Sequence, residues 1–217
     1  MYAYRLYHVA GHHRFTQQKN DPDLGLTAPF PITRSSMRRK VIRDLTGQTA
    51  YKQKSALIRR AFGQSDMPAS DRLAMAWKRL HGVVVTNAII FAILAATGHW
   101  WLFPALWIFP FMTFHELVVR IRSIAEHSMA PDNDDPFRNT RTTHANWLMR
   151  ALVAPYFVNY HLEHHLLMAV PCYNLPRAHE ILLAKGYALR MELQPGYTAM
   201  LALATSKPEQ SQMRAAA

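Results

Sequence analysis

Residues 81–119 read HGVVVTNAIIFAILAATGHWWLFPALWIFPFMTFHELVV, a long and mostly apolar stretch. It contains no Lys or Arg, and its one acidic residue is Glu116. A helix needs about 20 apolar residues to cross a bilayer, so the stretch is long enough for about two crossings. Gly98 lies near its middle and is followed by three tryptophans. We therefore expect a transmembrane hairpin with spans of about 83–97 and 101–119 that turns at Gly98.

Positive charge flanks this stretch on both sides. The chain has 25 Lys and Arg against 14 Asp and Glu, a net charge of +11. Fifteen of the basic residues precede residue 81, and ten follow residue 119. Because cytoplasmic segments of membrane proteins are enriched in Lys and Arg, we expect a multi-pass membrane protein with both termini on the cytoplasmic side. A hairpin buried inside a soluble protein, or a re-entrant hairpin, is the alternative.

The composition restricts the class of protein further. The single cysteine, Cys172, excludes an internal disulfide and fits a reducing compartment. A basic nucleic-acid binder would explain the charge but not the apolar stretch, so no nucleic-acid partner is expected. A basic helix from about Met37 resembles one lying on anionic headgroups, although an ordinary solvated helix fits nearly as well. Another helix is expected over 175–185, with Gly186 as its stop.

Six of the twelve histidines form two clusters, His8-Val-Ala-Gly-His12-His13 and His161-Leu-Glu-His164-His165. On a helix, residues three and four apart share a face, so the second cluster is expected to point toward one site. In the first cluster two histidines share a face, and the third lies about 100° away around the helix. Neutral imidazole is the usual nitrogen ligand of zinc, copper and iron, so the two clusters together predict a metal site.

The apolar stretch lies between the two clusters, which are 148 residues apart when counted from His13 to His161. They can share a metal site only if an even number of membrane crossings separates them. The charge pattern predicts two crossings, so both clusters are expected on the same side of the membrane.

Three segments resemble those of the membrane fatty acid desaturases. The run HVAGHHRFTQQKNDPDL, residues 8–24, resembles the second histidine box of that family together with the Asp-Pro-Asp after it. The segment RIRSIAEH, residues 120–127, is similar to the lone-histidine segment of the family. The run NYHLEHH, residues 159–165, followed by PCYNLP at 171–176, is similar to the third box.

The resemblance implies a histidine-ligated di-iron centre that desaturates fatty acyl chains of lipids. It implies two iron ions, O2 as co-substrate, a lipid acyl substrate, and an electron donor such as ferredoxin or cytochrome b5. The apolar residues 147–158 are candidates for lining an acyl channel, and core packing explains them equally well. The iron ligands that the resemblance implies are His8, His12, His13, His127, His161, His164 and His165.

The resemblance also implies the overall architecture, an all-α, membrane-embedded helical bundle with cytoplasmic histidine-bearing helices. The chain is expected to form a single partial desaturase-like domain, 1–217. Its expected segments are a cytoplasmic or interfacial part (1–80), the transmembrane hairpin (81–119), a cytoplasmic part with the lone histidine and the third box (120–190), and a disordered tail (207–217).

One feature of the family is expected to be missing. The family carries an upstream HxxxH box on a transmembrane helix, whereas Met1 lies seven residues before His8. We therefore expect a chain truncated at its amino end, with activity belonging to the intact enzyme. A non-catalytic remnant with an incomplete metal site is one alternative. A membrane di-iron hydroxylase, as the spacing at His8 also suggests, or a carotenoid-modifying oxygenase is another.

Several further residues are candidates for weaker roles. Glu163 and Asn159, and also Glu116 and Glu126, are expected to orient ligand imidazoles, because metal-bound histidines usually donate their second ring nitrogen. Isolated histidines are more simply interfacial or surface side chains; these are His81, His99, His115, His144 and His179.

Overall fold

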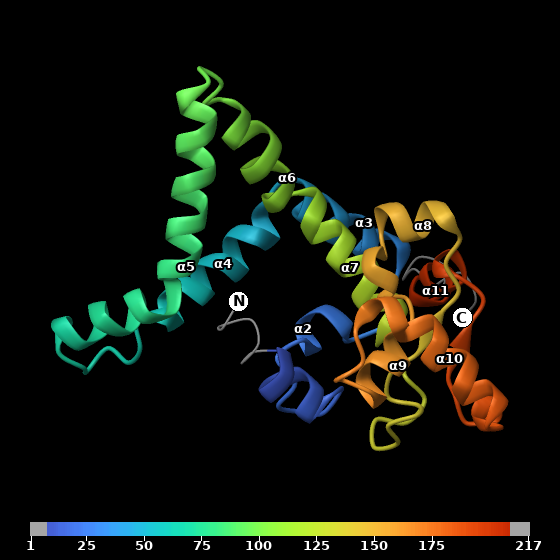
Figure 1. Cartoon of the computed structure of the whole chain (residues 1–217). Coiled ribbons are helices and arrows are strands. Elements are labelled where there is room, and N and C mark those ends of the chain that lie inside the picture. Colours follow the sequence, from blue (N-terminus) through green and yellow to red (C-terminus); the bar gives the residue numbers. More distant parts are fainter. Residues whose placement is uncertain (1–7, 209–217) are drawn as a thin grey trace. The chain divides into compact units, whose positions relative to one another are not determined.

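Helices make up most of the structure, a computed structural model that describes residues 8–208. The prediction of an all-α fold is confirmed to that extent. The described residues form two compact units, one of residues 39–117 and the other of 8–38 together with 118–208 (Figure 1). Most of the tail predicted to be disordered, 207–217, lies outside the described residues.

The unit of residues 39–117 is built from one long helix and several shorter segments. Its elements are the end of α3 (Arg34–Leu45), α4 (Gln48–Ala61), α5 (Ala69–Ala96), the π-helical turn η2 (Phe103–Ile108), α6 (Phe109–Met112) and the start of α7 (Phe114–Glu126). The basic helix predicted from about Met37 is α3, which begins three residues earlier, at Arg34.

Helix α5 contains the first predicted span, but it begins fourteen residues before Val83, at Ala69. Its carboxyl end is closed at the predicted turn. Gly98 has a φ of +78°, a left-handed conformation that costs glycine little. The Gly98 amide donates to Ala95 O (2.9 Å) and the His99 amide to Leu94 O (2.9 Å). This pair of hydrogen bonds is the Schellman arrangement that commonly ends a helix.

The second predicted span is not one continuous helix. Residues 103–126 divide into η2, α6 and α7, and two prolines, Pro104 and Pro110, lie in the first two of these segments. Proline lacks the amide hydrogen that a helix interior needs, so it interrupts the hydrogen-bond ladder. Thr113 then adopts a non-helical conformation between α6 and α7. Among the described residues, α5 is the one helix long and apolar enough to cross a membrane, so the two-crossing hairpin is not confirmed.

Apolar side chains of α5 and η2 are exposed rather than packed into a core. Val83, Ile89 and Ile93 expose 56%, 54% and 61% of their surfaces, and Leu106 exposes 68%. Large contiguous apolar surfaces are rare on soluble monomers. A hydrogen bond from the Trp107 indole to the Asn87 side chain (3.0 Å) joins the two segments. The exposure favours a lipid environment around this part of the chain.

The second unit carries the remaining elements. They are the π-helical turn η1 (His8–His13), α2 (Leu24–Thr27), the start of α3, the end of α7, β1 (Thr142–Thr143), α8 (Trp147–Leu152), η3 (Pro155–Phe157), α9 (His161–Leu166), η4 (Cys172–Asn174), α10 (Leu175–Ala184), η5 (Tyr187–Leu189), β2 (Leu193–Gln194) and α11 (Tyr197–Ala204). The helix predicted over 175–185 is confirmed as α10, and Gly186 follows it in a left-handed conformation.

A small apolar core holds the second unit together. Helix α11, for which the sequence pattern gave no prediction, supplies Tyr197 and Met200, which are 2% and 1% exposed. They pack with Ala125 of α7 and with Val153 and Ala154 beside α8. The segment predicted to line an acyl channel, 147–158, is therefore only partly buried. Val153 and Ala154 join the core, whereas Trp147 at the start of α8 is 74% exposed.

A buried segment around strand β1 fixes the carboxyl end of α7. Residues 140–143 are at most 6% exposed, although all four are polar. The Arg141 guanidinium donates to Ser128 O (2.7 Å), and the Arg141 amide donates to Glu126 O (3.1 Å). The Thr143 hydroxyl donates to Ala125 O (2.9 Å). Because the last carbonyls of a helix lack partners inside the helix, the bonds to Ala125 O and Glu126 O cap α7 directly before His127. The bond to Ser128 O holds the segment that follows the helix.

Replacing Arg141 with methionine is expected to destabilise this unit by about 1–3 kcal/mol, because the buried Ser128 carbonyl loses its donor. Thermal unfolding of the purified protein in detergent measures the change. The matched control is Arg177→Met, since the Arg177 side chain is 74% exposed. Equal unfolding temperatures for the two variants would contradict a stabilising role of the Arg141 guanidinium.

Candidate metal centre

All seven histidines predicted as ligands lie within the second unit, on three elements. Turn η1 carries His8, His12 and His13; His127 directly follows α7; and α9 carries His161, His164 and His165. Their ring nitrogens form two groups. The four-histidine group is His12, His127, His161 and His165, and the three-histidine group is His8, His13 and His164.

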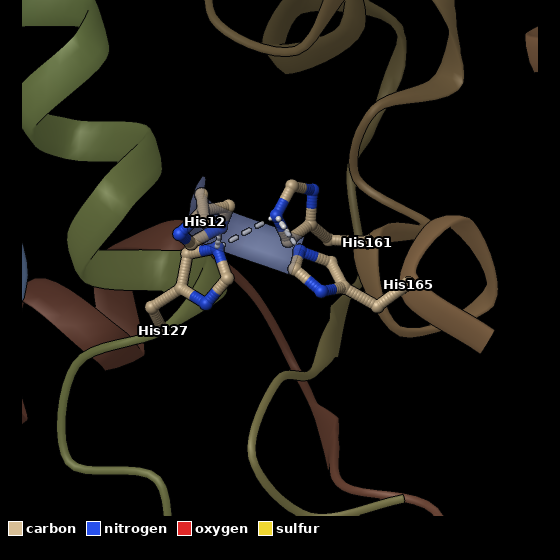
Figure 2. Close-up of side chains that lie close together, drawn as sticks. All are labelled: His12, His127, His161 and His165. Carbon is tan, nitrogen blue, oxygen red and sulfur yellow. Dashed lines mark hydrogen bonds between the residues drawn. The ribbon is translucent and has the colours of Figure 1, made fainter. Parts of the chain in front are cut away.

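The four-histidine group is largely enclosed by protein. His127 Nε2 lies 3.1 Å from His12 Nε2 and 2.7 Å from His161 Nε2. His165 Nε2 lies 3.2 Å from His161 Nε2. Figure 2 shows the four rings turned toward one another. Three of the four imidazoles are buried and that of His165 is half-buried, so bulk water has little access.

The three-histidine group has the same close spacing but more exposure to solvent. His13 Nε2 lies 3.2 Å from His8 Nε2 and 3.1 Å from His164 Nε2, and His8 and His164 are 3.5 Å apart. All three side chains are half-buried. Each group therefore turns its own Nε2 atoms toward one point, so there are two such points.

The conformation of η1 explains how its histidines divide between the groups. The expected α-helix would place His8 and His12 on one face. In the structure the segment is a π-helical turn, whose hydrogen bonds join residues five apart. It brings His8 and His13 together, while His12 turns to the other group.

Helix α9 divides its histidines in a similar way. His161 and His165, four residues apart, face the four-histidine group, whereas His164 faces the three-histidine group. The sequence predicts one shared point for all three. Two neighbouring points are what the structure has.

Fixed partners at Nδ1 set the orientation of two imidazoles. His12 Nδ1 lies 2.9 Å from Asp21 Oδ1, and Asp21 also accepts the amides of Gln17 (2.7 Å) and Asp23 (2.8 Å). His165 Nδ1 lies 3.2 Å from the Thr16 hydroxyl oxygen. A carboxylate can only accept, so the proton of His12 sits on Nδ1 and its Nε2 presents a lone pair. The Thr16 hydroxyl donates to His12 O (3.0 Å), so its oxygen is an acceptor for His165.

A carboxylate also lies behind His161. Glu126 Oε2 is 3.6 Å from His161 Nδ1, and Glu126 Oε1 accepts from Arg122 Nε (3.0 Å). Burial raises the pKa of Glu126, and the nearby Arg122 opposes that shift. This distance is too long for a hydrogen bond, so the orienting role of Glu126 stays a prediction.

Burial favours the neutral form of three imidazoles of the four-histidine group. It lowers the pKa of His127, His161 and His165 well below the ordinary value, and neighbouring histidines add to the effect. For the more exposed group, burial and neighbouring imidazoles lower the pKa of His8 to about 4 and of His13 to about 3. Neutral imidazole is the form that binds metals.

The two groups fit metal ions. A metal–imidazole bond is about 2.0–2.1 Å long, so two nitrogens on one metal lie about 2.8–3.4 Å apart at right or tetrahedral angles. The Nε2 separations quoted above, from 2.7 to 3.5 Å, match that spacing. Without a metal or a shared proton, facing lone pairs at such distances would repel. Imidazole suits zinc, copper, iron and nickel, so the donor set does not select among them.

Comparison with known proteins identifies the family. The model of the fatty acid desaturase family matches residues 1–196. The chain belongs to the fatty acid desaturase family. This membership supports an oxidoreductase of the desaturase kind, as the resemblance implied. No solved structure matches the chain significantly.

A curated relative of this desaturase-family chain is the dihydrorhizobitoxine desaturase of Bradyrhizobium elkanii. The two are 27% identical over 196 residues, which cover 86% of this chain and 55% of the relative. The chain thus spans about half the length of the curated relative that it matches.

The structure gives two of the predicted orienting residues other partners. Glu163 accepts from His179 Nδ1 (2.6 Å) and from the Thr142 hydroxyl, not from a cluster imidazole. Asn159 Nδ2 donates to Thr143 O (3.2 Å) and so supports strand β1.

Glu116 belongs to the other unit and pairs there with Lys54 (3.0 Å). Within the described part of the chain, the histidines predicted not to bind metal stay outside both groups; these are His81, His99, His115, His144 and His179.

Sequence reasoning did not single out Thr16 or Asp21 as partners of ligand histidines. A signal for Asp21 was present, because the Asp-Pro-Asp that follows the first cluster is part of the desaturase resemblance. Thr16 lies four residues after His12, and nothing in the sequence indicates that it faces His165.

Proposed function

We propose that this chain carries the histidine ligands of an O2-dependent, di-iron acyl desaturase. The observation that supports the proposal is the meeting of seven imidazoles in two groups, in a chain of the fatty acid desaturase family. Family membership argues for iron, since the histidines alone fit several metals. Two bound irons would supply the strong oxidant that removal of hydrogen from an unactivated CH2 group requires.

The residues of this chain have separate tasks in that proposal. His12, His127, His161 and His165 would hold one ion, and His8, His13 and His164 the other. Asp21 and Thr16 keep two of the imidazoles turned toward their ion. Burial of the four-histidine group excludes water, which protects reactive chemistry from side reactions.

The proposed substrate is a lipid acyl chain, and the proposed partner is a one-electron donor such as ferredoxin or cytochrome b5. The proposed protein is a multi-pass membrane protein, and the exposed apolar surface of α5 and η2 supports its membrane location. The basic residues on both flanks of 81–119 favour the cytoplasmic side for the histidine-bearing segments. A lipid substrate dissolved in the same bilayer would be available to such a protein.

A second candidate is a desaturase of a substrate other than a lipid acyl chain. The name of the relative from Bradyrhizobium elkanii gives dihydrorhizobitoxine as what that enzyme desaturates. The relative supports this candidate, whereas the family model supports the acyl substrate.

Product analysis tests the proposed function. The chain is expressed in a bacterial host, both as it stands and preceded by a helical segment bearing HxxxH, and the cellular fatty acids are profiled. We expect a new double bond in at least one form, and its complete loss in His164→Ala, because His164 belongs to the three-histidine group. Conversion of dihydrorhizobitoxine without any change in fatty acids would favour the second candidate. No unsaturated product in either form would contradict both.

A further inference from the structure

A buried carboxylate lies between two histidines of the third box. Glu163 is 0% exposed and sits on α9 between His161 and His164. Both of its carboxylate oxygens have partners: Oε1 accepts from His179 Nδ1 (2.6 Å) and Oε2 accepts from the Thr142 hydroxyl. Burying a carboxylate is costly unless it is hydrogen-bonded, and hydrogen bonds to a charged group are strong. These two hydrogen bonds therefore hold the Glu163 carboxylate in one position.

The two partners of Glu163 come from different parts of the chain. His179 lies on α10 and Thr142 on strand β1, so the carboxylate joins three elements. The ring of Tyr160, the residue before α9, also contacts the His179 ring, with centroids 5.3 Å apart. Each tether acts at the start of the helix that carries three ligand histidines.

Helix α9 needs such tethers because it is short. It has six residues, and no side chain caps its amino end. Isolated helices of fewer than about 12 residues are unstable in water, so its position must come from tertiary contacts. A hydrogen bond fixes direction as well as distance, which apolar packing does less strictly.

The tether through Thr142 also reaches the histidine after α7. The Arg141 amide and the Thr143 hydroxyl cap the carboxyl end of α7, directly before His127. The same strand thus holds both α7 and α9. The 2.7 Å separation of His127 Nε2 and His161 Nε2 depends on how these two elements are placed.

We propose that His179 and Thr142 are positioning residues, which hold Glu163 and through it set the direction of the ligand histidines on α9. The inference rests on the proposed metal-binding function. It gives a role to a histidine that lies outside both groups, and it assigns Glu163 to the support of the ligand helix.

The test compares His179→Leu with His179→Asn in the whole 217-residue chain, purified in detergent. Leucine removes the donor, whereas the asparagine amide places an N–H close to the position of Nδ1. Binding of Co²⁺ is followed by its visible absorption, and unfolding temperatures are measured without metal. We expect His179→Leu to weaken Co²⁺ binding about 10–100-fold and to shift the absorption bands, because partners that support ligands have effects of this size.

The conservative variant is expected to restore most of the affinity and the original bands. Thr142→Val is expected to act like His179→Leu, since it removes the other donor to Glu163. The matched control is His144→Leu, because His144 is exposed and lies outside both histidine groups.

The outcomes separate the two proposals. Co²⁺ binding by the wild type with the same affinity and bands in His179→Leu would overturn the positioning role and leave the metal function intact. Lower unfolding temperature in His179→Leu with unchanged Co²⁺ bands would show a merely structural role and would also overturn it. Failure of the wild type to bind Co²⁺ would contradict the proposed metal function itself.

Discussion

Replacing His161 with alanine is expected to remove about one metal ion per chain, because the ion of the four-histidine group would lose one of its four ligands. His161 Nε2 lies 2.7 Å from His127 Nε2 and 3.2 Å from His165 Nε2, so it faces two other members of its group. No other imidazole in the described part of the chain has its ring nitrogen placed to substitute for it. Elemental analysis of the protein purified after growth with iron gives the metal content.

The control for this prediction is His144→Ala, which removes an exposed histidine and should leave the metal content unchanged. His8→Ala is a second comparison, because His8 belongs to the half-buried three-histidine group. This variant should lose the ion of the three-histidine group and keep the ion of the four-histidine group. Wild-type metal content in His161→Ala would mean that the four imidazoles are not ligands of a common ion.

Local spacing was sufficient to find the histidines but not to assign them to groups. The prediction that distant clusters meet relies on residues three and four apart sharing a helical face, and the structure brings all seven together. Their division into four and three depends on the π-helical turn of η1. The spacing of His8, His12 and His13 is compatible with an α-helix or a π-helix, and the choice depends on packing elsewhere.

Contacts between segments distant in the chain could not be predicted from the sequence. The Glu163 side chain was expected to orient a metal-ligand imidazole because of its neighbours in the chain. It bonds instead to Thr142 and His179, which are 21 and 16 residues away. Nothing in the periodicity of 131–143 shows that a polar loop ends in a buried strand, because its polar groups find partners only in the folded chain.

The apolar stretch 81–119 shows what composition does not predict. An apolar stretch free of basic residues correctly indicated α5 and the turn at Gly98. Composition does not register backbone hydrogen bonding, however, and the prolines at 104 and 110 fall in the two segments that precede α7. The proposal of two crossings therefore needs a direct test.

A cysteine placed at position 99 is expected to react from outside the cell, while Cys172 is expected to react only after the membrane is opened. Cys172 is the single cysteine and is exposed, so the wild-type chain reports the side of the histidine-bearing unit. The variant His99→Cys in a Cys172→Ser background reports the turn after α5, where residue 99 is exposed. Labelling of intact cells with a membrane-impermeant maleimide distinguishes the two positions.

The expected difference is close to all-or-none, because a charged maleimide does not cross the bilayer and the two positions lie on opposite sides in the two-crossing topology. Basic residues on both flanks of 81–119 favour that topology over its inverse. The matched control is Asp134→Cys, which changes an exposed residue of the segment before strand β1. It should behave like Cys172. If His99→Cys were labelled only after lysis, the segment after α5 would return to the cytoplasmic side without crossing. The hairpin would then be re-entrant, and both histidine clusters would still face the same compartment.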